Sequence, residues 1–595
     1  MCPWFGLRLF SHWHTGGRTS MSRLYKRYHA GQPLHLFSIP LWQLKHAEIY
    51  ARGARDSPFT PLEERPMPQN VYNWRLYATA MVASFAALAV GYDSTFIAQS
   101  LALPSLTSEL GFDHMTASHR ASVSENISTA YQAGAMFGSF AAYPVAHCLG
   151  HKLSLVWFSL FLILGSSLTL GADYNRGLDF IYAGRTLTGM GVGACCMVTP
   201  IYLSEISPPA IRGRICGMFG LFWQFGGVAG FWINYAVFQT LDSSRKQWLI
   251  PFGLQLLPAG LLFFGALFWL KESPRWLLSN KSERRDDAIA NLKWMRRLPA
   301  DDTYFVEEVA MIEYAIIREH TSETFWQPFK AVLTHKPLQR RLLLVALMMM
   351  LHSATGATAV SYYSPTLFKS IAITGTENSL LSTGVLSIMQ ASCALLWMLF
   401  LIDRLGRRNL LMLGAAGCSI SLWIIGAQIF TQRTSPTNAE PNSHNAMNIA
   451  AVCFIYFHIS FFSLSWSGTP WVLTSEIFST SQTRALGQSH AAFQFWLWQF
   501  VFSRFLPQMF SQMGKNGYGV FFFFASVMLV GVGIVWLGLP ETRAVLLEDM
   551  DRLFEIKPAR KANRKMMQHV EDMALGQGRL EMEMEIDTSS IGKAF

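Results

Sequence analysis

The stretch IYAGRTLTGMGVGACCMVTPIYLSEISPPAIRGR, residues 181–214, is an apolar, helix-length segment with a charge inside it and a charged exit. Small side chains recur along its apolar part: Gly184, Gly189, Gly191, Gly193 and Ala194. In lipid, small residues let two helices approach closely and gain van der Waals contact. Arg185 lies among them, and because an unpaired charge at membrane depth is costly, it needs a partner and a function. The stretch therefore predicts a tightly packed membrane helix that carries a functional ion pair.

Parts of this stretch, and of the segment before it, return later in the chain. The sequence SEI of residues 204–206 recurs at residues 475–477, and the motif at residues 147–152 matches the motif at residues 403–408. One half of the chain thus repeats the other. Repeated halves around a substrate site near the bilayer midplane are typical of secondary transporters.

The composition is that of a membrane protein with several spans. Of the 595 residues, 51% are hydrophobic and only 14% are charged. Long stretches contain no Asp, Glu, Lys or Arg: 153–172, 249–270, 409–432 and 517–539. About 20 apolar residues in a helix cross the hydrocarbon core of a bilayer. We therefore predict an all-α membrane protein with about 12 transmembrane helices in two pseudo-symmetric six-helix halves.

The predicted spans divide evenly between the two halves. They are 76–101, 126–146, 153–172, 179–203, 214–238 and 248–270, then 342–371, 379–402, 409–431, 448–475, 485–511 and 517–539. The predicted domains are a disordered cytosolic tail (1–70), the first half (71–270), cytosolic linker helices (271–340), the second half (341–539) and a charged cytosolic tail (540–595). For the first tail, a mitochondrial presequence and an upstream extension before Met21 or Met67 stay open as alternatives.

The linker has the pattern of short amphipathic helices. Ser273 followed by Pro274 is a favourable helix start. Apolar residues then recur among mixed charges: Ile289, Leu292, Met295, Val306, Val309, Ile312 and Ile316. This spacing predicts helices with one buried face.

The net charge of +10 is explained by a membrane topology and does not indicate a nucleic-acid partner. Basic residues gather in alternate loops, among them 271–341 and 404–408, whereas the intervening loops are short and mixed or acidic. This asymmetry places both termini and the linker in the cytosol. Most of the eight cysteines lie in apolar stretches, without the spacing of a disulfide framework or a metal site. No nucleophile or nucleotide motif indicates an enzyme or a cofactor.

A series of short motifs occurs in order over residues 70–555. They are VYNWR (71–75), GYDS (91–94), ALPS (102–105), GR (184–185), 205–213, ESPRW (272–276), YYSP (362–365), 403–408, 476–484, PET (540–542) and LEDMD (547–551). With these motifs the chain resembles the sugar porter family of the major facilitator superfamily, and within it the fungal quinate and sugar permeases. The resemblance implies a secondary active transporter that moves a sugar or a sugar-like polyol such as quinate by alternating access. It also implies that a single chain suffices, in the plasma membrane.

The resemblance further implies a proton-coupling pair, Asp93 in the first span and Arg185 in the fourth. In proton-coupled members of the family, the matching acid and arginine pair and exchange a proton during transport. An intramembrane carboxylate whose ionisation depends on a nearby arginine is a workable proton switch. A static structural pair is the alternative.

Charges at the cytosolic ends of the spans are implied to form networks between the halves that break when the halves rock. They are Glu205, Arg212, Glu272, Arg275, Asp403, Arg407, Glu476 and Arg484. Partly buried ion pairs suit such a two-state contact, and lipid-facing positive-inside charge is the alternative. The chain departs from the family pattern at His147 and His151, where an acid and a base are expected. We therefore expect the two halves to be gated unequally, with titration of these histidines shifting the balance.

The candidate substrate-binding residues follow from the same resemblance. They are Gln224, Asn234, His352, Tyr362, Tyr363, Trp471 and Gln499. An amide bonds vicinal hydroxyls as donor and acceptor, and an aromatic face covers the C–H side of a sugar ring; helix packing is the alternative for each residue. Most second-half amides of the family are replaced in this chain, by residues such as Ala391 and Phe495. We therefore expect a less polar or anionic polyol rather than an ordinary hexose, with His352 facing a carboxylate.

A non-transporting nutrient sensor, which would keep the fold and signal through a tail, is the competing hypothesis. Both predicted tails are longer than the core requires. Against the sensor, Asp93, Arg185, Gln224 and Trp471 are all present, and a sensor would lose its coupling residues first. The transporter is therefore the preferred interpretation, with a small-molecule sugar or polyol, a proton and the lipid bilayer as its partners.

Overall fold

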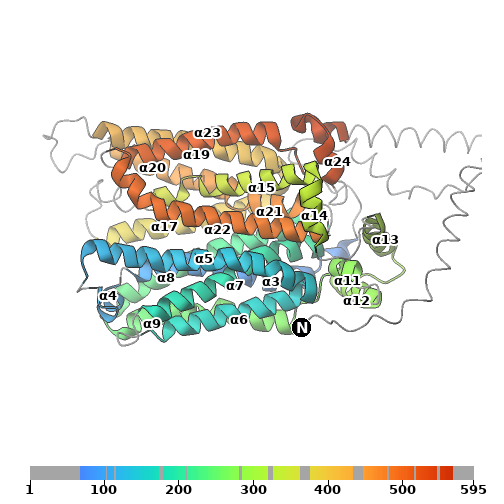
Figure 1. Cartoon of the computed structure of the whole chain (residues 1–595), viewed down its shortest axis with the longest axis horizontal. Coiled ribbons are helices and arrows are strands. Elements are labelled where there is room, and N and C mark those ends of the chain that lie inside the picture. Colours follow the sequence, from blue (N-terminus) through green and yellow to red (C-terminus); the bar gives the residue numbers. More distant parts are fainter. Residues whose placement is uncertain are drawn as a thin grey trace, which may run out of the picture. The chain divides into compact units, whose positions relative to one another are not determined.

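Helices make up the regular structure of the described chain, in which no strand occurs (Figure 1). The computed structural model describes residues 68–566 except 102, 113–114, 173–177, 209–210, 281–283, 319–325, 362–375, 433–445, 479–480, 515–516, 544 and 546–549. All of these residues belong to one unit, Ser57–Met566. Most of the two predicted tails, residues 1–67 and 567–595, lies outside the described residues.

Two groups of long helices lie with their axes in the same general direction (Figure 1). The first half consists of α3 (Trp74–Ser100), α5 (Ala117–Leu149), α6 (His151–Leu170), α7 (Asp179–Ile206), α8 (Arg212–Thr240), α9 (Arg245–Leu254) and α10 (Leu256–Phe268). The second half consists of α15 (Lys336–Ser353), α17 (Thr376–Leu396), α18 (Ile402–Leu405), α19 (Arg407–Gln432), α20 (Ala446–Phe461), α21 (Thr469–Glu476), α22 (Ser481–Gln512) and α23 (Tyr518–Gly538). Short helices η1 (Gln69–Val71) and α4 (Pro104–Glu109) accompany the first half.

Within the described residues, every predicted span lies on one or more of these helices. Ten helical stretches among the described residues are long and apolar enough to cross a membrane. Two further helices, α5 with 33 residues and α22 with 32, are long enough as well but are richer in polar side chains. The prediction of an all-α membrane fold is confirmed.

The second half interrupts its helices where the sequence predicts continuous ones. The π-helix η6 (Trp397–Leu401) joins α17 to α18, and the π-helix η7 (Phe462–Trp466) follows α20. The predicted span 342–371 is also broken, because α15 ends at Ser353 and helix resumes only at residue 357. Gly356 has a φ of +82°, which favours glycine and stops a right-handed helix. The stretch Lys336–Ser361 is nevertheless long and apolar enough to cross a membrane, and residues 362–371 of the predicted span lie outside the described residues.

Glycines bring helices α5 and α7 into backbone contact. A Cβ added at Gly189 or Gly193 would collide with backbone atoms of α5, and one added at Gly134 or Gly138 would collide with the backbone of α7. We call these four glycines the glycine seam. The small residues of the 181–214 stretch therefore pack as the sequence predicts, since van der Waals contact replaces the missing hydrophobic drive in lipid.

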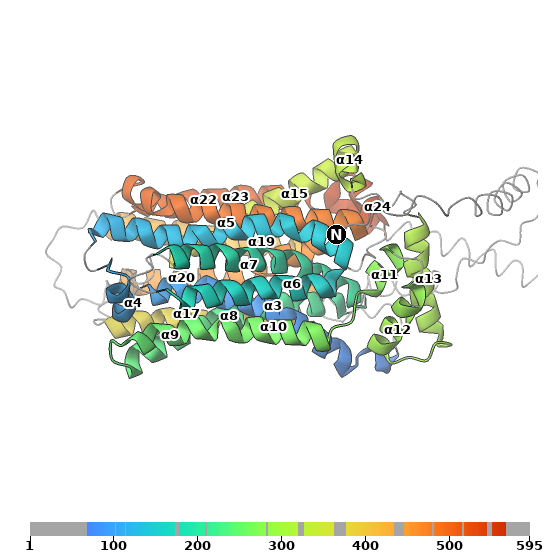
Figure 2. The same ribbon diagram turned by 60° about the horizontal axis from the view of Figure 1, so that its bottom comes forward.

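The two halves meet along α5 and α22, which lie side by side in both views (Figures 1 and 2). Gln132 of α5 donates a hydrogen bond to the hydroxyl of Ser503 at 2.9 Å. Nearer the other end of the pair, the hydroxyl of Ser489 donates to the carbonyl of Ser139 at 2.8 Å. Because these polar contacts lie at two levels of α22, they fix the register of one half against the other.

Four helices of the linker follow α10: α11 (Pro274–Asn280), α12 (Arg285–Arg296), α13 (Thr303–Arg318) and α14 (Gln327–Thr334). Helices α11–α13 gather at one end of the bundle, which we call the linker end (Figure 2). The helix start at Pro274 is confirmed. Leu292, Met295, Val309 and Ile312 are buried as predicted, whereas Val306 is 51% exposed and points away from that face.

Buried polar contacts attach the linker to the first half. Arg296 donates to the carbonyl of Ile206 at 2.9 Å and pairs with Glu308 at 2.7 Å. Burial alone would lower the pKa of Arg296, but the charge of Glu308 and its hydrogen bonds outweigh burial, so this pKa is raised. Asn73, the N-cap of α3, donates to the carbonyl of Met295 at 2.7 Å. The linker is thus held at the ends of α3 and α7.

Part of the segment predicted as the C-terminal tail is folded. Helix α24 (Met550–Glu555) lies at the linker end, and its Met550 and Leu553 side chains are buried. Arg341 at the start of α15 lies 5.3 Å from the centre of the Phe554 ring. The packed structure therefore continues beyond residue 540.

Candidate functional site

Asp93 on α3 and Arg185 on α7 face each other inside the first half. Nη1 of Arg185 lies 3.4 Å from Oδ1 of Asp93, and both residues are almost completely buried. The guanidinium also lies 4.2 Å from the centre of the Tyr131 ring on α5. A cation over a ring face is stabilised by the ring's quadrupole. The sequence-predicted pair is therefore brought together, and three helices position its arginine.

Three side chains at the linker end form what we call the first-half cluster: His151, Glu205 and Glu272. Nδ1 of His151 lies 3.7 Å from Oε2 of Glu205 and 3.8 Å from Oε1 of Glu272, which is too long for hydrogen bonds. The hydroxyl of Ser273 donates to Glu205 at 2.5 Å. His147, the other predicted histidine, stacks on the Tyr143 ring of its own helix and lies outside this cluster.

Three side chains form the matching second-half cluster: Asp403, Arg407 and Glu476. Arg407 donates to both carboxylate oxygens of Glu476, at 3.0 and 3.3 Å. Nη1 of Arg407 lies 3.4 Å from Oδ1 of Asp403. This two-bond geometry is the strong form of an arginine–carboxylate contact, and histidine cannot reproduce it.

A carboxylate caps the first turn of the helix beside each cluster. Glu272 accepts from the first backbone N–H of α6 at 2.9 Å, and Glu541 accepts from the first backbone N–H of α19 at 2.9 Å. The residues before these helices, Gly150 and Gly406, have φ values of +90° and +83°. Both caps satisfy backbone donors that the helix leaves unpaired. The sequence analysis missed Glu541 as a site residue, although the repeat of Glu272-Ser by Glu541-Thr could have indicated it.

The clusters also join the two halves. Arg484 of α22 lies 3.7 Å from Glu205 of α7. The backbone of Gly213 on α8 lies so close to the Asp403 carboxylate that an added Cβ would collide with it. Sequence-predicted charges of the two halves therefore meet across the linker end.

The two remaining predicted gate residues lie nearby. Arg212 is buried, and its charge acts on Cys216 together with those of Glu476, Arg407 and Asp403. Arg275 lies in the first turn of α11 and is half-buried. All eight predicted gate residues thus lie at the linker end.

A group of aromatic rings, the aromatic cluster, lies between the halves. Its members are Phe219 and Trp223 of α8, Trp471 of α21, and Phe495 and Trp496 of α22. The Phe495 ring centre lies 5.1 Å from that of Trp471 and 5.1 Å from that of His352. Two of the sequence-predicted binding residues, Trp471 and His352, therefore meet at Phe495.

Gln224 joins the same site from the first half. Its amide donates to the hydroxyl of Ser467, which follows η7 in the second half, at 2.9 Å. The backbone of Ser467 also interacts with the imidazole of His352. Sequence reasoning missed Ser467 because its position depends on the π-helix before it. Gln224, His352 and Trp471 are thus brought together with Ser467 and Phe495.

Of the four other predicted binding residues, Asn234 and Gln499 lie within the described part of the chain. Asn234 is buried between α3 and α8, where it accepts from Ser100 at 2.7 Å and donates to the carbonyl of Gly230 at 2.8 Å. These bonds give Asn234 a structural task within the first half. Gln499 lies on α22, about one turn beyond Phe495, and is half-buried. Tyr362 and Tyr363 lie outside the described residues.

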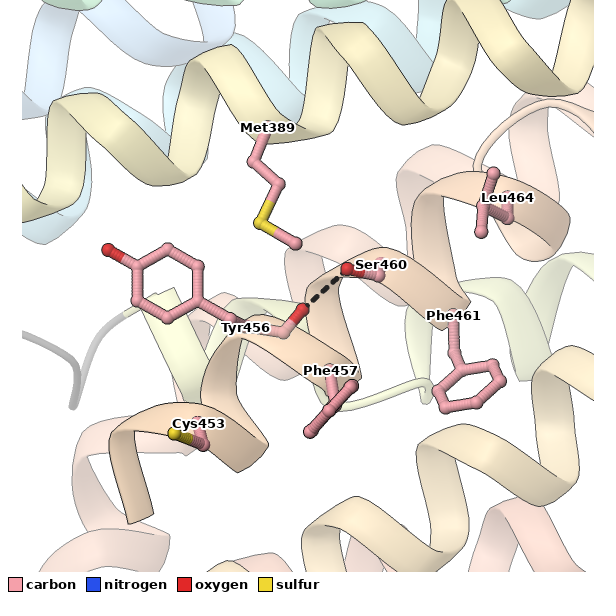
Figure 3. A pocket seen from close by; sticks show the side chains of 7 residues that line it. All are labelled: Met389, Cys453, Tyr456, Phe457, Ser460, Phe461 and Leu464. Carbon is pink, nitrogen blue, oxygen red and sulfur yellow. Dashed lines mark hydrogen bonds between the residues drawn. The ribbon is translucent and has the colours of Figure 1, made fainter. Parts of the chain in front are cut away.

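A groove of about 440 Å³ lies between α17 and α20 (Figure 3). It is lined by Met389, Cys453, Tyr456, Phe457, Ser460, Phe461 and Leu464. The hydroxyl of Ser460 is used within the helix, where it donates to the carbonyl of Tyr456 at 2.7 Å. The largely apolar walls of the groove suit a polyhydroxylated ligand poorly. The site around Ser467 and Phe495 is therefore the better candidate for substrate.

The sequence pattern of the family described as "Sugar (and other) transporter" matches residues 79–554. This chain belongs to that family. A "Probable quinate permease" of Aspergillus clavatus is 48% identical over 84% of this chain and 92% of its own length. A "Probable quinate permease" of Aspergillus niger is 47% identical over 86% of this chain and 94% of its own length. The protein is therefore a membrane transporter of the sugar type and not an enzyme.

A solved structure shares the fold. The proton:xylose symporter XylE of the major facilitator superfamily, bound to 6-bromo-6-deoxy-D-glucose, superposes with a TM-score of 0.69. The match covers 80% of this chain and 99% of XylE at 22% identity. The predicted major-facilitator fold is confirmed.

Proposed function

We propose that this protein is a proton symporter for a polyol carboxylate of the quinate type, working by alternating access. The observation that carries the proposal is the buried Asp93–Arg185 pair, with its oxygen and nitrogen 3.4 Å apart inside the first half. A carboxylate and a guanidinium buried together on membrane helices are expected to serve ion or proton movement. The names of the two permease relatives support the substrate class.

In this proposal Asp93 is the proton carrier. While Asp93 is ionised, the nearby charge of Arg185 compensates it. When Asp93 takes a proton, the ion pair is lost and Arg185 keeps its contacts with the Tyr131 and Phe96 rings and with the backbone carbonyl of Asp93. The loss loosens α3 against α7, so the protonation state of Asp93 biases which side of the membrane the site faces.

Substrate would bind between the halves, at the group around Ser467. Gln224 supplies an amide for vicinal hydroxyls, and Trp471 with Phe495 supplies ring faces for the C–H side of a cyclohexane ring. Since Gln224 and Ser467 come from different halves, a ligand that replaces their mutual hydrogen bond would be held by both halves at once. The ligand can leave such a site only when one half moves.

The linker end acts as the cytosolic gate in this proposal. Closing it brings Arg484 to Glu205 and Gly213 to Asp403; opening it parts these residues of different halves. In this proposal the protein lies in the plasma membrane, and the basic loops at this end favour a cytosolic position for the linker end and for both termini. A single chain contains both halves of the gate, so one chain suffices.

Uptake assays in yeast that lacks its own hexose transporters test the proposal. Labelled quinate, glucose, xylose, galactose and myo-inositol are supplied at pH 5 and pH 7, with and without an uncoupler. We expect quinate uptake that is faster at pH 5 and collapses with the uncoupler, and at least about a tenfold loss in Asp93→Asn, because the amide cannot exchange the proton.

Two controls make the assay decisive. Asn234→Ser alters a buried polar residue of the first half outside the proposed proton path and should keep the pH dependence. Uptake that ignores both pH and Asp93→Asn would mean a uniporter. Surface-localised protein that takes up no member of the panel would contradict transport of this substrate class and favour the nutrient sensor.

A further inference from the structure

His352 is a titratable side chain that touches the aromatic cluster. It lies in the last turn of α15, is 7% exposed, and packs with its ring edge-on against Phe495 and Phe462 at 5.1 and 5.8 Å. Within the described part of the chain its Nδ1 atom has no hydrogen-bond partner. A buried ring nitrogen without a partner costs free energy unless a ligand supplies the missing bond.

The carboxylate of a bound substrate would compensate a positive charge on the buried His352 ring. The C-terminal end of a helix carries a partial negative charge, and a cation in the last turn is stabilised by it. The next residue, Ser353, is also buried, and its hydroxyl has no hydrogen-bond partner among the described residues. The end of α15 therefore carries two unsatisfied polar groups in consecutive residues.

We propose that His352 selects substrates that carry a carboxylate. In its protonated form it donates from Nδ1 to a carboxylate oxygen, while the hydroxyls of the same ligand are bound by Gln224 and Ser467. The proton on the imidazole and the negative charge of the substrate cancel, so the occupied site is neutral overall. This assignment rests on the proposed function and names the residue that separates a polyol carboxylate from a neutral polyol.

The test compares quinate with quinamide, its neutral amide analogue. Purified full-length protein is titrated with each compound, and binding is followed by tryptophan fluorescence, since Trp471 lies in the site. The readout is the ratio of the two dissociation constants. Wild-type protein should prefer quinate by about tenfold, the difference expected between a charge-assisted and a neutral hydrogen bond. His352→Gln should bring the ratio close to one without weakening quinamide binding.

Two more variants protect the test against a folding defect. His352→Asn keeps a donor near the Nδ1 position without the charge and should also lose the preference. His458→Gln changes another completely buried histidine of the second half, on α20, and should keep the wild-type ratio.

The outcomes separate this inference from the proposed function. A wild-type preference that survives in both His352 variants would overturn the role of His352 and leave the proposed function standing. Equal binding of quinate and quinamide by the wild type would overturn the anion site. Wild-type protein that binds neither compound would overturn the proposed substrate class, and this inference with it.

Discussion

At the linker end, both halves share the same backbone frame but carry different cations. The frame is a positive-φ glycine before a helix together with a carboxylate that caps this helix. In the second-half cluster, Arg407 donates two hydrogen bonds to Glu476. In the first-half cluster, His151 takes the corresponding place and stays 3.7 Å from Glu205. The glycine and the capping carboxylate are alike in both, so the frame does not depend on the cation. The helix caps therefore set the geometry of both clusters, whereas the cation sets the strength of each cluster.

The cation also decides which contacts Glu205 depends on. Arg407 is always charged, whereas histidine changes its charge near neutral pH. Glu205 faces Arg484 of the other half as well as His151 of its own half. When His151 is neutral, the attraction between Glu205 and Arg484 is at its strongest. When His151 is protonated, it shares Glu205 and repels Arg484, so the contact between the halves weakens.

Removing the cation of the second-half cluster should have the largest effect. Arg407→Ala leaves Glu476, which is 3% exposed, without its two-bond partner. Breaking a buried pair by deleting one member costs about 3–5 kcal/mol. We expect that loss in the free energy of unfolding, measured by thermal and denaturant unfolding in detergent. His151→Ala should cost less, about 2 kcal/mol, because it leaves a cavity at a buried position but removes no two-bond ion pair. Equal losses would contradict the difference between the clusters.

Changing the frame should affect both halves alike. Gly150→Ala and Gly406→Ala each force a side chain into a positive-φ conformation, and the new Cβ would also press on the capping carboxylate. Each substitution should cost about 1–3 kcal/mol of unfolding free energy. The double variant should show the sum, since the two sites share no partner. A marked difference between the two single variants would show that the frames are not equivalent.

Exchanging the cation of the first-half cluster should have the smallest effect. We expect this effect in how often the linker end opens. Cys216 is buried among the gate charges, so its labelling by N-ethylmaleimide reports opening of the linker end. The exposed Cys148 and Cys453, and Cys2, are first replaced by serine. We expect Cys216 to be labelled about fivefold faster in His151→Arg than in His151→Gln at every pH. An effect of this size is expected from weakening one partly buried charge interaction.

Wild-type labelling is taken as a ratio to His151→Gln at each pH to cancel thiol ionisation. This ratio should rise toward the His151→Arg value as the pH falls from 8.5 to 5.5 and His151 gains its proton. The charged groups that face His151 are Glu205, Glu272, Arg484 and the neighbouring Lys152. His147→Gln is the matched control and should behave as the wild type. A pH-independent wild-type ratio would rule out His151 as the source of the asymmetry.

Much of the fold could be predicted from the sequence, because charge-free runs and repeated motifs depend on composition and order alone. The approach of Arg185 to Asp93 could also be expected, since a buried charge needs a partner. The substrate group could be predicted only in part. Ser467 reaches Gln224 through a π-helix that apolar periodicity does not reveal, and Asn234 is used up by neighbours on α3. Which face of a membrane helix points inward is poorly encoded when both faces are apolar.

The glycine seam has a mechanical consequence. At the glycine seam the two backbones touch without intervening side chains that could change rotamer. We therefore expect α5 and α7 to move together as one rigid body. Among the described residues, the helices of the second half are interrupted at Gly356, η6 and η7. We therefore expect bending during transport to occur at these interruptions rather than at the contact between α5 and α7.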